Sequence, residues 1–259
     1  IRTPTTSAAE MSLLFPPPST LIGALARGLS YVSKEKWAEC IIDSKRRILK
    51  SSAVKLLKFV VSAHFGLDIN SVGIMPWNDI THSYAIPYLQ TEYRKIKHKI
   101  RWFGVHASGK IYSPNSSSHI IYVINENKAV DTLGKNWINR LKEAAYSITS
   151  IGGKEGLTVT QNVNVLKAKV IKSASIITLY YLPKESVEDY TPQKLREEEF
   201  WDYTETSPHW SSKSKTLPKR IPYILPIDRI TLVPRVIEAY LSKKGVGLTS
   251  DNSPENTVI

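Results

Sequence analysis

Residues Phe15–Leu29 read FPPPSTLIGALARGL, so that three consecutive prolines lead directly into an apolar run. The prolines Pro16–Pro18 hold φ at about −65° and cannot continue the interior of a strand or a helix. Ser19 is a good N-cap residue, because its hydroxyl can accept a hydrogen bond from an orphan backbone N–H. Leucine then recurs every four residues from Leu21 to Leu29, which predicts an amphipathic helix over residues 20–31.

The chain of 259 residues carries 35 Lys and Arg against 23 Asp and Glu, a formal net charge of +12. Such a surplus points to a polyanionic partner, with nucleic acid first and an anionic membrane surface second. A basic surface without a ligand is the third interpretation. No apolar run reaches the ~18 residues of a membrane span, so we expect a globular chain without a membrane-spanning segment. Of the two polyanionic partners we expect nucleic acid and no membrane.

Cys40 is the only cysteine, which excludes an intramolecular disulfide and any multi-cysteine zinc site. A single cysteine fits a reducing compartment, so we expect a cytoplasmic protein. The six histidines show no HExxH or other metal-ligand spacing. The sequence therefore predicts neither a structural metal nor a cofactor.

The periodicity of apolar residues predicts further elements in the first part of the chain. Residues 34–65 are interpreted as a second helical region, with apolar side chains on one face and Lys and Arg crowding the rest. That basic face is either a solvated surface or a contact for a phosphate backbone or an acidic subunit. We expect an irregular chain over residues 70–87, a buried strand over 119–125 and a helix over 136–148.

The second part of the chain is expected to contain more strands. LTVTQNVNVL, residues 157–166, alternates apolar and polar residues, which predicts a half-buried strand with its valines facing the core. Residues 175–182 are predicted to be another strand that pairs with it as a hairpin. Beyond these lie a long, partly mobile segment, a short strand over 229–233, a helix over 235–243 and a disordered end.

The clearest candidate for nucleic-acid contact is YRKIKHKIRWFG, residues Tyr93–Gly104. Read as a strand, it places Lys95, Lys97, Lys99 and Arg101 on one face. Trp102 follows directly in sequence, on the other face with Ile96, His98 and Ile100. Cations neutralise phosphates, and an aromatic ring stacks a base for roughly 1–3 kcal/mol. A helix with Ile96, Ile100 and Phe103 aligned is the structural alternative, and a charged edge strand that blocks aggregation is the functional one.

Two weaker features also suit phosphate contact. In the junction IGGKEGL, Gly152 and Gly153 let the backbone approach a ligand, and Lys154 adds charge. The spacing matches neither a dinucleotide fingerprint nor a Walker loop, and a plain turn is the alternative. The exposed N–H groups of Ser19 and Thr20 at the helix start are the other candidate, although the prolines also serve simply to aim the helix.

The sequence offers little support for catalysis. No GxSxG motif, paired-carboxylate spacing or metal-carboxylate signature occurs. Metal-free RNA cleavage uses His, Tyr and Lys side chains, and His98 with Tyr93 and Lys95 or Lys97 forms such a set. Because these residue types meet by chance in any basic strand, we predict no catalytic residue and keep cleavage as an alternative.

The motif PPPSTLIGALARGL, Pro16–Leu29, is similar to the signature of the fifth CRISPR-associated protein family. Members of that family are RAMP-superfamily subunits of type I Cascade surveillance complexes. SIGGKEGLTV, Ser150–Val159, resembles the family's glycine-containing junction between a helix and a strand. IRTPTTSAAE, Ile1–Glu10, lies where the family has a segment containing Arg and Thr after its first strand. The motif looks most like the archaeal type I-A members, in which a separate endonuclease matures the guide.

The resemblance implies an α+β fold with a ferredoxin-like (RRM-related) core whose first strand precedes Ile1. It implies that residues 1–182 form this RNA-binding core. A thumb-like insertion at about 70–115 would include the basic stretch. Residues 183–259 would form a smaller C-terminal extension that is partly disordered.

The same resemblance implies a non-catalytic subunit that binds and caps the repeat-derived 5′ handle of CRISPR RNA in antiviral defence. Its neighbours would be the Cascade backbone subunit and the Cascade large subunit, and target DNA would be engaged indirectly. The alternatives are a metal-independent processing endoribonuclease of the same family and a purely protein-binding assembly subunit. The residues expected to contact RNA are Arg2, Ser19, Thr20, Lys95, Lys97, Lys99, Arg101, Trp102, Gly152, Gly153 and Lys154.

Overall fold

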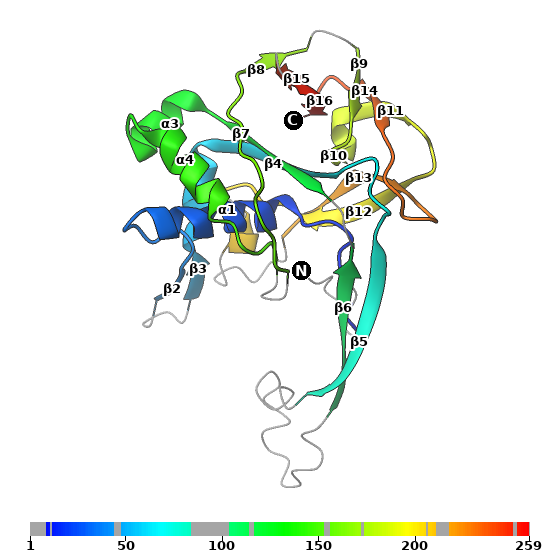
Figure 1. The fold of residues 1–259 in the computed structure, drawn as a ribbon, viewed down its shortest axis with the longest axis horizontal. Helices are drawn as coiled ribbons and strands as arrows, with labels where there is room; N and C mark the ends of the chain where they lie inside the picture. The colour runs from blue at the N-terminus through cyan, green and yellow to red at the C-terminus, as the bar shows by residue number, and fades with distance from the viewer. Residues whose placement is uncertain are drawn as a thin grey trace. The chain divides into compact units, whose positions relative to one another are not determined.

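Figure 1 shows the chain as a computed structural model. The structure describes residues 9–10, 12–43, 48–83, 104–113, 117–152, 156–171, 174–205, 207–210, 218–250 and 253–258. The chain divides into two units. The smaller unit consists of Ile1–Leu14 and Ile74–Pro114, and the larger unit of Phe15–Gly73 and Asn115–Ile259.

The smaller unit contains a three-stranded sheet with the order β1-β6-β5. β5 (Met75–Ser83) and β6 (Gly104–Tyr112) pair antiparallel along their whole length, and β1 (Ala9–Glu10) adds a short parallel pair to β6. The chain between the two long strands, residues 84–103, holds most of the predicted basic stretch and lies outside the described residues.

The larger unit begins with the proline-led helix. α1 (Pro18–Val32) starts at the third proline, which suits a first helical turn because that position needs no N–H donor. Leu21, Leu25 and Leu29 are all buried. The helix predicted over residues 20–31 is therefore confirmed.

A two-stranded sheet lies next to this helix. β4 (Val60–Leu67) pairs antiparallel with β7 (Ser118–Ile124), and α1 packs against β4 and against α4 (Trp137–Tyr146). The Tyr122 hydroxyl of β7 donates a hydrogen bond of 2.8 Å to the carbonyl oxygen of Leu21 in α1. β7 and α4 confirm the strand and the helix predicted for these parts of the sequence, but β7, predicted to be buried, is half-buried to exposed along its length. α3 (Glu126–Leu133) connects the two elements.

Backbone hydrogen bonds extend this sheet toward the C-terminal part of the chain. Gly66 of β4 forms an antiparallel bridge with Tyr180, and the Tyr181 N–H donates to the Phe65 carbonyl oxygen at 3.1 Å. The strands that follow form a sheet of order β10-β13-β12, made of β10 (Leu182–Pro183), β13 (Arg220–Asp228) and β12 (Leu195–Trp201).

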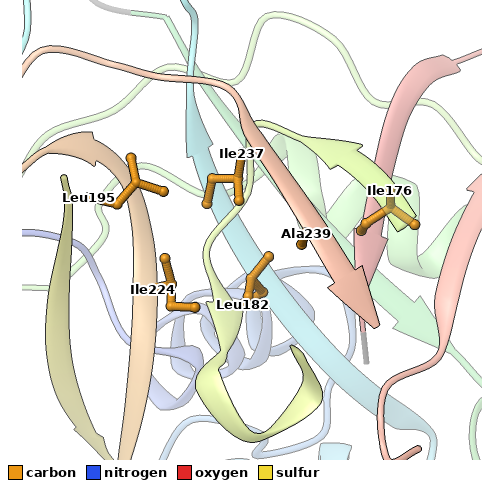
Figure 2. Packing of buried hydrophobic residues seen from close by; sticks show 6 residues of the cluster. All are labelled: Ile176, Leu182, Leu195, Ile224, Ile237 and Ala239. Atoms are coloured by element: carbon orange, nitrogen blue, oxygen red, sulfur yellow. The ribbon is translucent and has the colours of Figure 1, made fainter. Parts of the chain in front are cut away.

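A second sheet packs on those strands through a shared apolar core, which Figure 2 shows from close by. It has the order β11-β14-β9 and consists of β11 (Val187–Thr191), β14 (Ile237–Leu241) and β9 (Ser175–Thr178). The core between the sheets is built from Ile176, Leu182, Leu195, Ile224, Ile237 and Ala239. Each of these side chains is at most 3% exposed, so this part of the chain is held by ordinary hydrophobic burial.

Among the described residues of the larger unit, two smaller sheets and three 3₁₀ helices remain. The sheets have the orders β16-β15-β8 and β2-β3. Their strands are β2 (Cys40–Asp43), β3 (Ile48–Ser51), β8 (Ala168–Val170), β15 (Gly247–Ser250) and β16 (Ser253–Val258). The 3₁₀ helices are η1 (Ser52–Lys58), η4 (Lys184–Ser186) and η5 (Pro208–Trp210).

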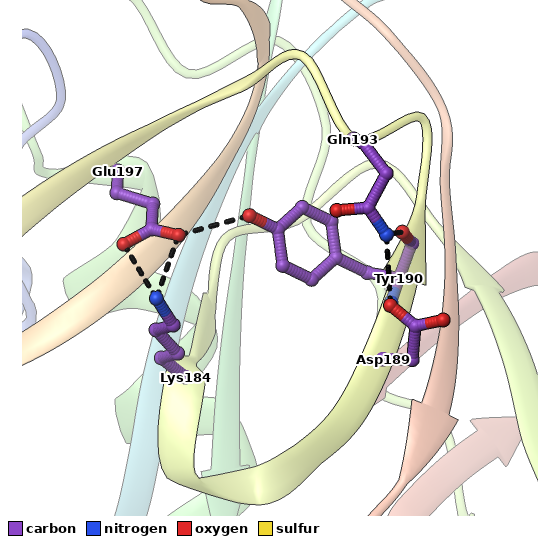
Figure 3. Close-up of polar contacts among 5 residues, drawn as sticks. All are labelled: Lys184, Asp189, Tyr190, Gln193 and Glu197. Carbon is purple, nitrogen blue, oxygen red and sulfur yellow. Dashed lines mark hydrogen bonds and ion pairs between the residues drawn. The ribbon is translucent and has the colours of Figure 1, made fainter.

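A polar network joins η4, β11 and β12 at the surface (Figure 3). The Lys184 Nζ donates to both carboxylate oxygens of Glu197, at 2.8 and 2.9 Å, and the Tyr190 hydroxyl donates to the same carboxylate at 2.9 Å. Gln193 Nε2 donates to the Asp189 carboxylate at 2.8 Å, which links the chain just after β11 to that strand. Lys184 above all holds the pKa of Glu197 below its usual range.

The region 34–65, interpreted as a second helical region, contains more strand than helix. It contains β2, β3 and β4, and only the short η1 is helical. Val60–Leu67 is rich in β-branched and aromatic residues, and seven of its residues find partners across β7. Long-range pairing of this kind outweighs a local helical pattern, because strand preference is set by cross-strand packing.

Other predictions in the strand-rich parts are also wrong. Residues 70–87, predicted to be irregular, contain β5 in spite of Pro76. Residues 229–233, predicted to be a strand, follow the end of β13, which covers Arg220–Asp228. The helix predicted over 235–243 is the strand β14. The end expected to be disordered contains β16, which pairs with β15.

The fold is therefore a mixed α/β arrangement with small antiparallel sheets and few helices. Among the described residues, no helix is long and apolar enough to cross a membrane. Strand β9 pairs with β14 and not with residues 157–166, so the predicted hairpin between these segments is wrong.

Candidate nucleic-acid interface

The β5–β6 hairpin presents two aromatic side chains, a methionine and a lysine on one face. Met75 lies opposite Tyr112, and Trp77 lies opposite Lys110. Directly opposed residues of an antiparallel pair project from the same face, and so do residues two apart along a strand. Met75, Trp77 and Tyr112 are 52%, 59% and 62% exposed. We call these four residues the hairpin face.

The chemistry of the hairpin face suits single-stranded nucleic acid. Exposed aromatic rings stack bases of any identity, and neighbouring cations attract the phosphates between them. From Ile74 to Pro114 the sequence contains six Lys and Arg against two Asp and Glu, and five of the six lie within residues 94–101. The hairpin therefore combines exposed aromatic surface with a local excess of positive charge.

Sequence reasoning missed Trp77, Lys110 and Tyr112. Pro76 argued against a strand there, because proline cannot donate to a β-ladder. The register that sets Trp77 beside Lys110 joins residues 33 positions apart, and no local pattern reveals such a pairing. The one signal available was the concentration of aromatic residues around the basic stretch.

Most of the residues predicted to contact RNA fall outside the described residues. These are Arg2, Lys95, Lys97, Lys99, Arg101, Trp102, Gly153 and Lys154. Ser19, Thr20 and Gly152 are described. The first two lie together in the first turn of α1, and Gly152 lies separately in the turn after α4.

The start of α1 differs in detail from the prediction. Pro17, and not Ser19, is the N-cap residue, and no side chain caps this end of the helix. Ser19 is only 9% exposed, and the Thr20 N–H donates to the Pro17 carbonyl oxygen at 2.9 Å. The helix starts two residues closer to the N-terminus than predicted, so the Thr20 N–H is occupied within the chain. A contact of this turn with RNA remains a prediction.

Gly152 lies in a tight turn. Its φ of +87° is in the region that favours glycine over residues with a side chain. The Ile151 N–H donates to the Gly156 carbonyl oxygen, and Ser150 bridges Leu157. These bonds close the turn between α4 and the chain that follows, and they leave Gly152 itself exposed.

Phe15 anchors the proline segment in the core. Its ring packs edge-on against Phe65 of β4, with 5.1 Å between the centroids, and lies 6.4 Å from the ring of Tyr181. Tyr181 in turn contacts Phe200 and Tyr223 at 5.5 and 5.4 Å. The approach to α1 is therefore fixed by aromatic packing as well as by the prolines.

His64 has a strongly lowered pKa, and its role is structural. His64 of β4 is 2% exposed, and burial lowers its pKa to about 4. Its Nδ1 lies 3.2 Å from the Tyr181 carbonyl oxygen and its Nε2 lies 3.0 Å from the Ser62 hydroxyl. A carbonyl can only accept, so Nδ1 carries the proton and Nε2 accepts from Ser62. His64 is thus a neutral core residue.

The histidine proposed for cleavage, His98, and its companions Tyr93, Lys95 and Lys97 lie outside the described residues. In the part of the chain that the structure describes, no group of three or more His, Cys, Asp or Glu side chains is placed to hold a metal ion.

Comparison with known proteins gives relatives from one archaeon, Saccharolobus solfataricus, while no protein-family model matches. The protein named "CRISPR-associated protein Cas5 2" is 30% identical over 186 residues, which cover 71% of this chain and 64% of that relative. "CRISPR-associated protein Cas5 3" is 28% identical over 238 residues, and "CRISPR system aCascade subunit Cas5 1" is 28% identical over 239 residues. Each of these two alignments covers 91% of this chain and 85% of the relative.

A solved structure shares the fold. The crystal structure of a CRISPR protein from Archaeoglobus fulgidus superposes with a TM-score of 0.54 at 16% identity, covering 98% of this chain and 90% of that chain. The fold and the three relatives agree with the resemblance carried by Pro16–Leu29. The chain belongs to the Cas5 family of CRISPR-associated proteins.

Proposed function

We propose that this chain is a non-catalytic subunit of a CRISPR Cascade complex that binds the 5′ handle of the guide RNA. Membership of the Cas5 family supports the proposal, and one relative is named as a subunit of aCascade. In this role the chain contacts the Cascade backbone and large subunits and meets target DNA only through the complex. The site of action is the cytoplasm.

The hairpin face is the observation that carries RNA binding. Trp77 and Tyr112 offer rings that stack unpaired bases, while Lys110 and the basic residues of the connecting chain attract phosphates. Stacking is tolerant of base identity, so this face supplies affinity. In the proposal, selectivity for the handle comes from contacts outside the hairpin face, which are held in a fixed geometry.

The turns of the larger unit supply that geometry in the proposal. Phe15 holds the proline segment against Phe65, so the first turn of α1 does not have to be ordered when RNA binds. The exposed turn at Gly152 lets backbone approach a sugar or a phosphate closely. Contacts by Arg2, Gly153 and Lys154 belong to the same proposal.

A ferredoxin-like core is part of the proposal. Support comes from α1 and α4, which pack together, and from α1 lying on the antiparallel β4–β7 pair. The division into a core over residues 1–182, an insertion at about 70–115 and an extension over 183–259 is proposed with it.

The test is binding of the purified full chain to a 5′ handle RNA and to a scrambled RNA of equal length, in EDTA, at two salt concentrations. The proposal predicts tighter binding of the handle and intact RNA on a denaturing gel. For single strands, log Kd should change with log salt by about 0.7 for each phosphate contacted. Equal affinity for both RNAs contradicts handle recognition. Discrete cleavage in EDTA supports the processing-nuclease alternative.

A further inference from the structure

Residues 157–166 run in extended conformation along the end of α4, and four of their five apolar side chains are exposed, whereas Val163 is half-buried. Leu157 is 81% exposed and Val159 is 88% exposed. Thr158 and Thr160, which alternate with them, are half-buried. This is the reverse of the orientation that the sequence predicts, in which the apolar side chains face the core.

Hydrogen bonds to α4 and to the chain just after it fix the reversed orientation. The Thr158 N–H donates to the Thr149 carbonyl oxygen at 3.0 Å, and the Thr160 hydroxyl donates to the Ala145 carbonyl oxygen at 3.0 Å. The Ala145 carbonyl oxygen also accepts from the Ile148 N–H at 3.2 Å, so the threonine hydroxyl adds a further hydrogen bond to it. Because side chains alternate along extended chain, Leu157 and Val159 must then point away.

The exposed apolar surface continues along the same segment. The Val163 N–H donates to the Tyr146 hydroxyl of α4 at 3.3 Å, and Tyr146 is 48% exposed. Val165 and Leu166 are 50% and 44% exposed. Gln161, Asn162 and Asn164 are exposed as well, so the inward-facing polar side chains are those of Thr158 and Thr160. Exposed leucine and valine side chains that alternate with inward-facing threonines are typical of a surface that another molecule covers.

The charge of the segment selects the kind of molecule. Residues 156–166, GLTVTQNVNVL, contain no Lys, Arg, His, Asp or Glu, although the whole chain has a formal net charge of +12. RNA binding depends on cations that neutralise phosphates, and this surface offers none. An apolar, uncharged protein surface is complementary to it.

We infer that residues 157–166 form a docking surface for another protein subunit of the complex, which contacts Leu157 and Val159 through an apolar, uncharged patch. This goes beyond handle binding, because it requires no contact of these residues with RNA. It follows that assembly and RNA binding use different surfaces of the chain and can be disrupted separately.

The test compares the double variant Leu157→Ser/Val159→Ser with a matched control, Val72→Ser/Ile230→Ser. The control residues are 75% and 84% exposed and lie outside the segment. Each full-length protein is titrated into the Cascade backbone and large subunits in the presence of guide RNA. Hydrogen exchange of the peptide covering residues 156–166 is measured in the free chain and in the complex.

The first double variant should join the complex about 10- to 100-fold more weakly than the wild type, since burial of two apolar side chains is lost. The control should assemble like the wild type. Both variants should keep the unfolding midpoint and the handle affinity of the wild type, because the replaced side chains are exposed. Exchange in residues 156–166 should slow on assembly.

Four results would overturn the inference. The first is equal assembly by the segment variant and the control. The second is a free wild-type dimer that Leu157→Ser/Val159→Ser converts to monomer, which would assign the surface to a second copy. The third is loss of handle affinity in the isolated variant, which would assign it to RNA. The fourth is failure of the wild type to join the complex. That result would not contradict handle binding, which is measured on the free chain.

Discussion

Gly28 of α1 lies against the backbone of Ala144 in α4, so closely that a Cβ at Gly28 would sit 2.8 Å from the Ala144 carbonyl carbon and closer still to its oxygen. Gly23, one and a half turns earlier, has nothing within 4 Å of the corresponding position. The two helices therefore touch through a glycine on one side of α1 and leave room on the other.

Gly28→Ala should destabilise the fold and Gly23→Ala should not. Alanine gains about 1 kcal/mol over glycine in a helix interior, whereas overpacking against fixed backbone costs about 1–3 kcal/mol. We expect Gly28→Ala to lower the free energy of unfolding by up to about 2 kcal/mol and Gly23→Ala to raise it by up to about 1 kcal/mol. Urea unfolding of the two variants measures both. Equal effects would show that α1 and α4 do not approach at Gly28.

His64 should make stability depend on pH. Its pKa is about 4 in the folded chain, against an ordinary value of 6.5, because burial disfavours the charged ring. The unfolded chain therefore takes up the proton first. The stabilisation is complete above about pH 6.5 and is lost as the pH falls toward 4, by about 3 kcal/mol in all.

The measurement is urea unfolding at pH 7 and pH 4.5 for the wild type and for His64→Gln. Glutamine keeps a donor and an acceptor without titrating, so the loss of stability at pH 4.5 should be smaller by about 2 kcal/mol in this variant. The exposed His119→Gln variant should behave like the wild type. The same pH dependence in all three proteins would contradict the assignment.

The pair of Lys184 and Glu197 should contribute little to stability. Its side chains are 47% and 39% exposed, and exposed pairs contribute about 0.2–1 kcal/mol. A double-mutant cycle with Lys184→Met and Glu197→Gln should give a coupling in that range. The more exposed Lys244–Glu185 pair, at 3.5 Å, should give a smaller one. A larger coupling in the second pair would contradict this ranking.

Trp77→Ala should weaken RNA binding without changing its salt dependence. Stacking on one base contributes about 1–3 kcal/mol, which corresponds to a loss of about 5- to 150-fold in affinity. The slope of log Kd against log salt should stay the same, because no phosphate contact is removed. The measurement is a titration of handle RNA at two salt concentrations.

Tyr31→Ala is the matched control for Trp77. Tyr31 is 60% exposed and, like Trp77, has a cation beside it, since the Arg27 guanidinium lies 5.8 Å from its ring centroid. It belongs to the larger unit and not to the hairpin face. An equal loss of RNA affinity in both variants would contradict a specific role of the hairpin face, because any exposed aromatic ring would then contribute equally.

Sequence reasoning succeeded where local signals decide the structure. The prolines before α1 and the four-residue spacing of its leucines are contained within one short stretch, and so is the apolar pattern of α4. β4 was missed because its conformation depends on pairing with β7, more than 50 residues away. Contacts across such distances leave no periodic mark in the sequence.

For the candidate site, too, the sequence revealed the features set by local signals and not those set by long-range pairing. The basic residues were apparent from composition, but the hairpin face required the register that sets Trp77 beside Lys110. Residues 157–160 were assigned the wrong orientation for a related reason, whereas Val163 is half-buried between exposed Asn162 and Asn164, as the alternation predicts. The alternation of LTVTQNVNVL is real, but the bond from Thr160 to the Ala145 carbonyl decides which side faces the protein.

The most direct test of the account is photo-crosslinking of a 5′ handle RNA to the intact chain, with mapping of the crosslinked peptides. It asks in one measurement whether the chain binds the handle and where. We predict that the handle crosslinks more strongly than a scrambled RNA and that crosslinks include peptides between Ile74 and Pro114, with Trp77 among the modified residues. No preference for the handle, or no crosslink within Ile74–Pro114, would contradict the account.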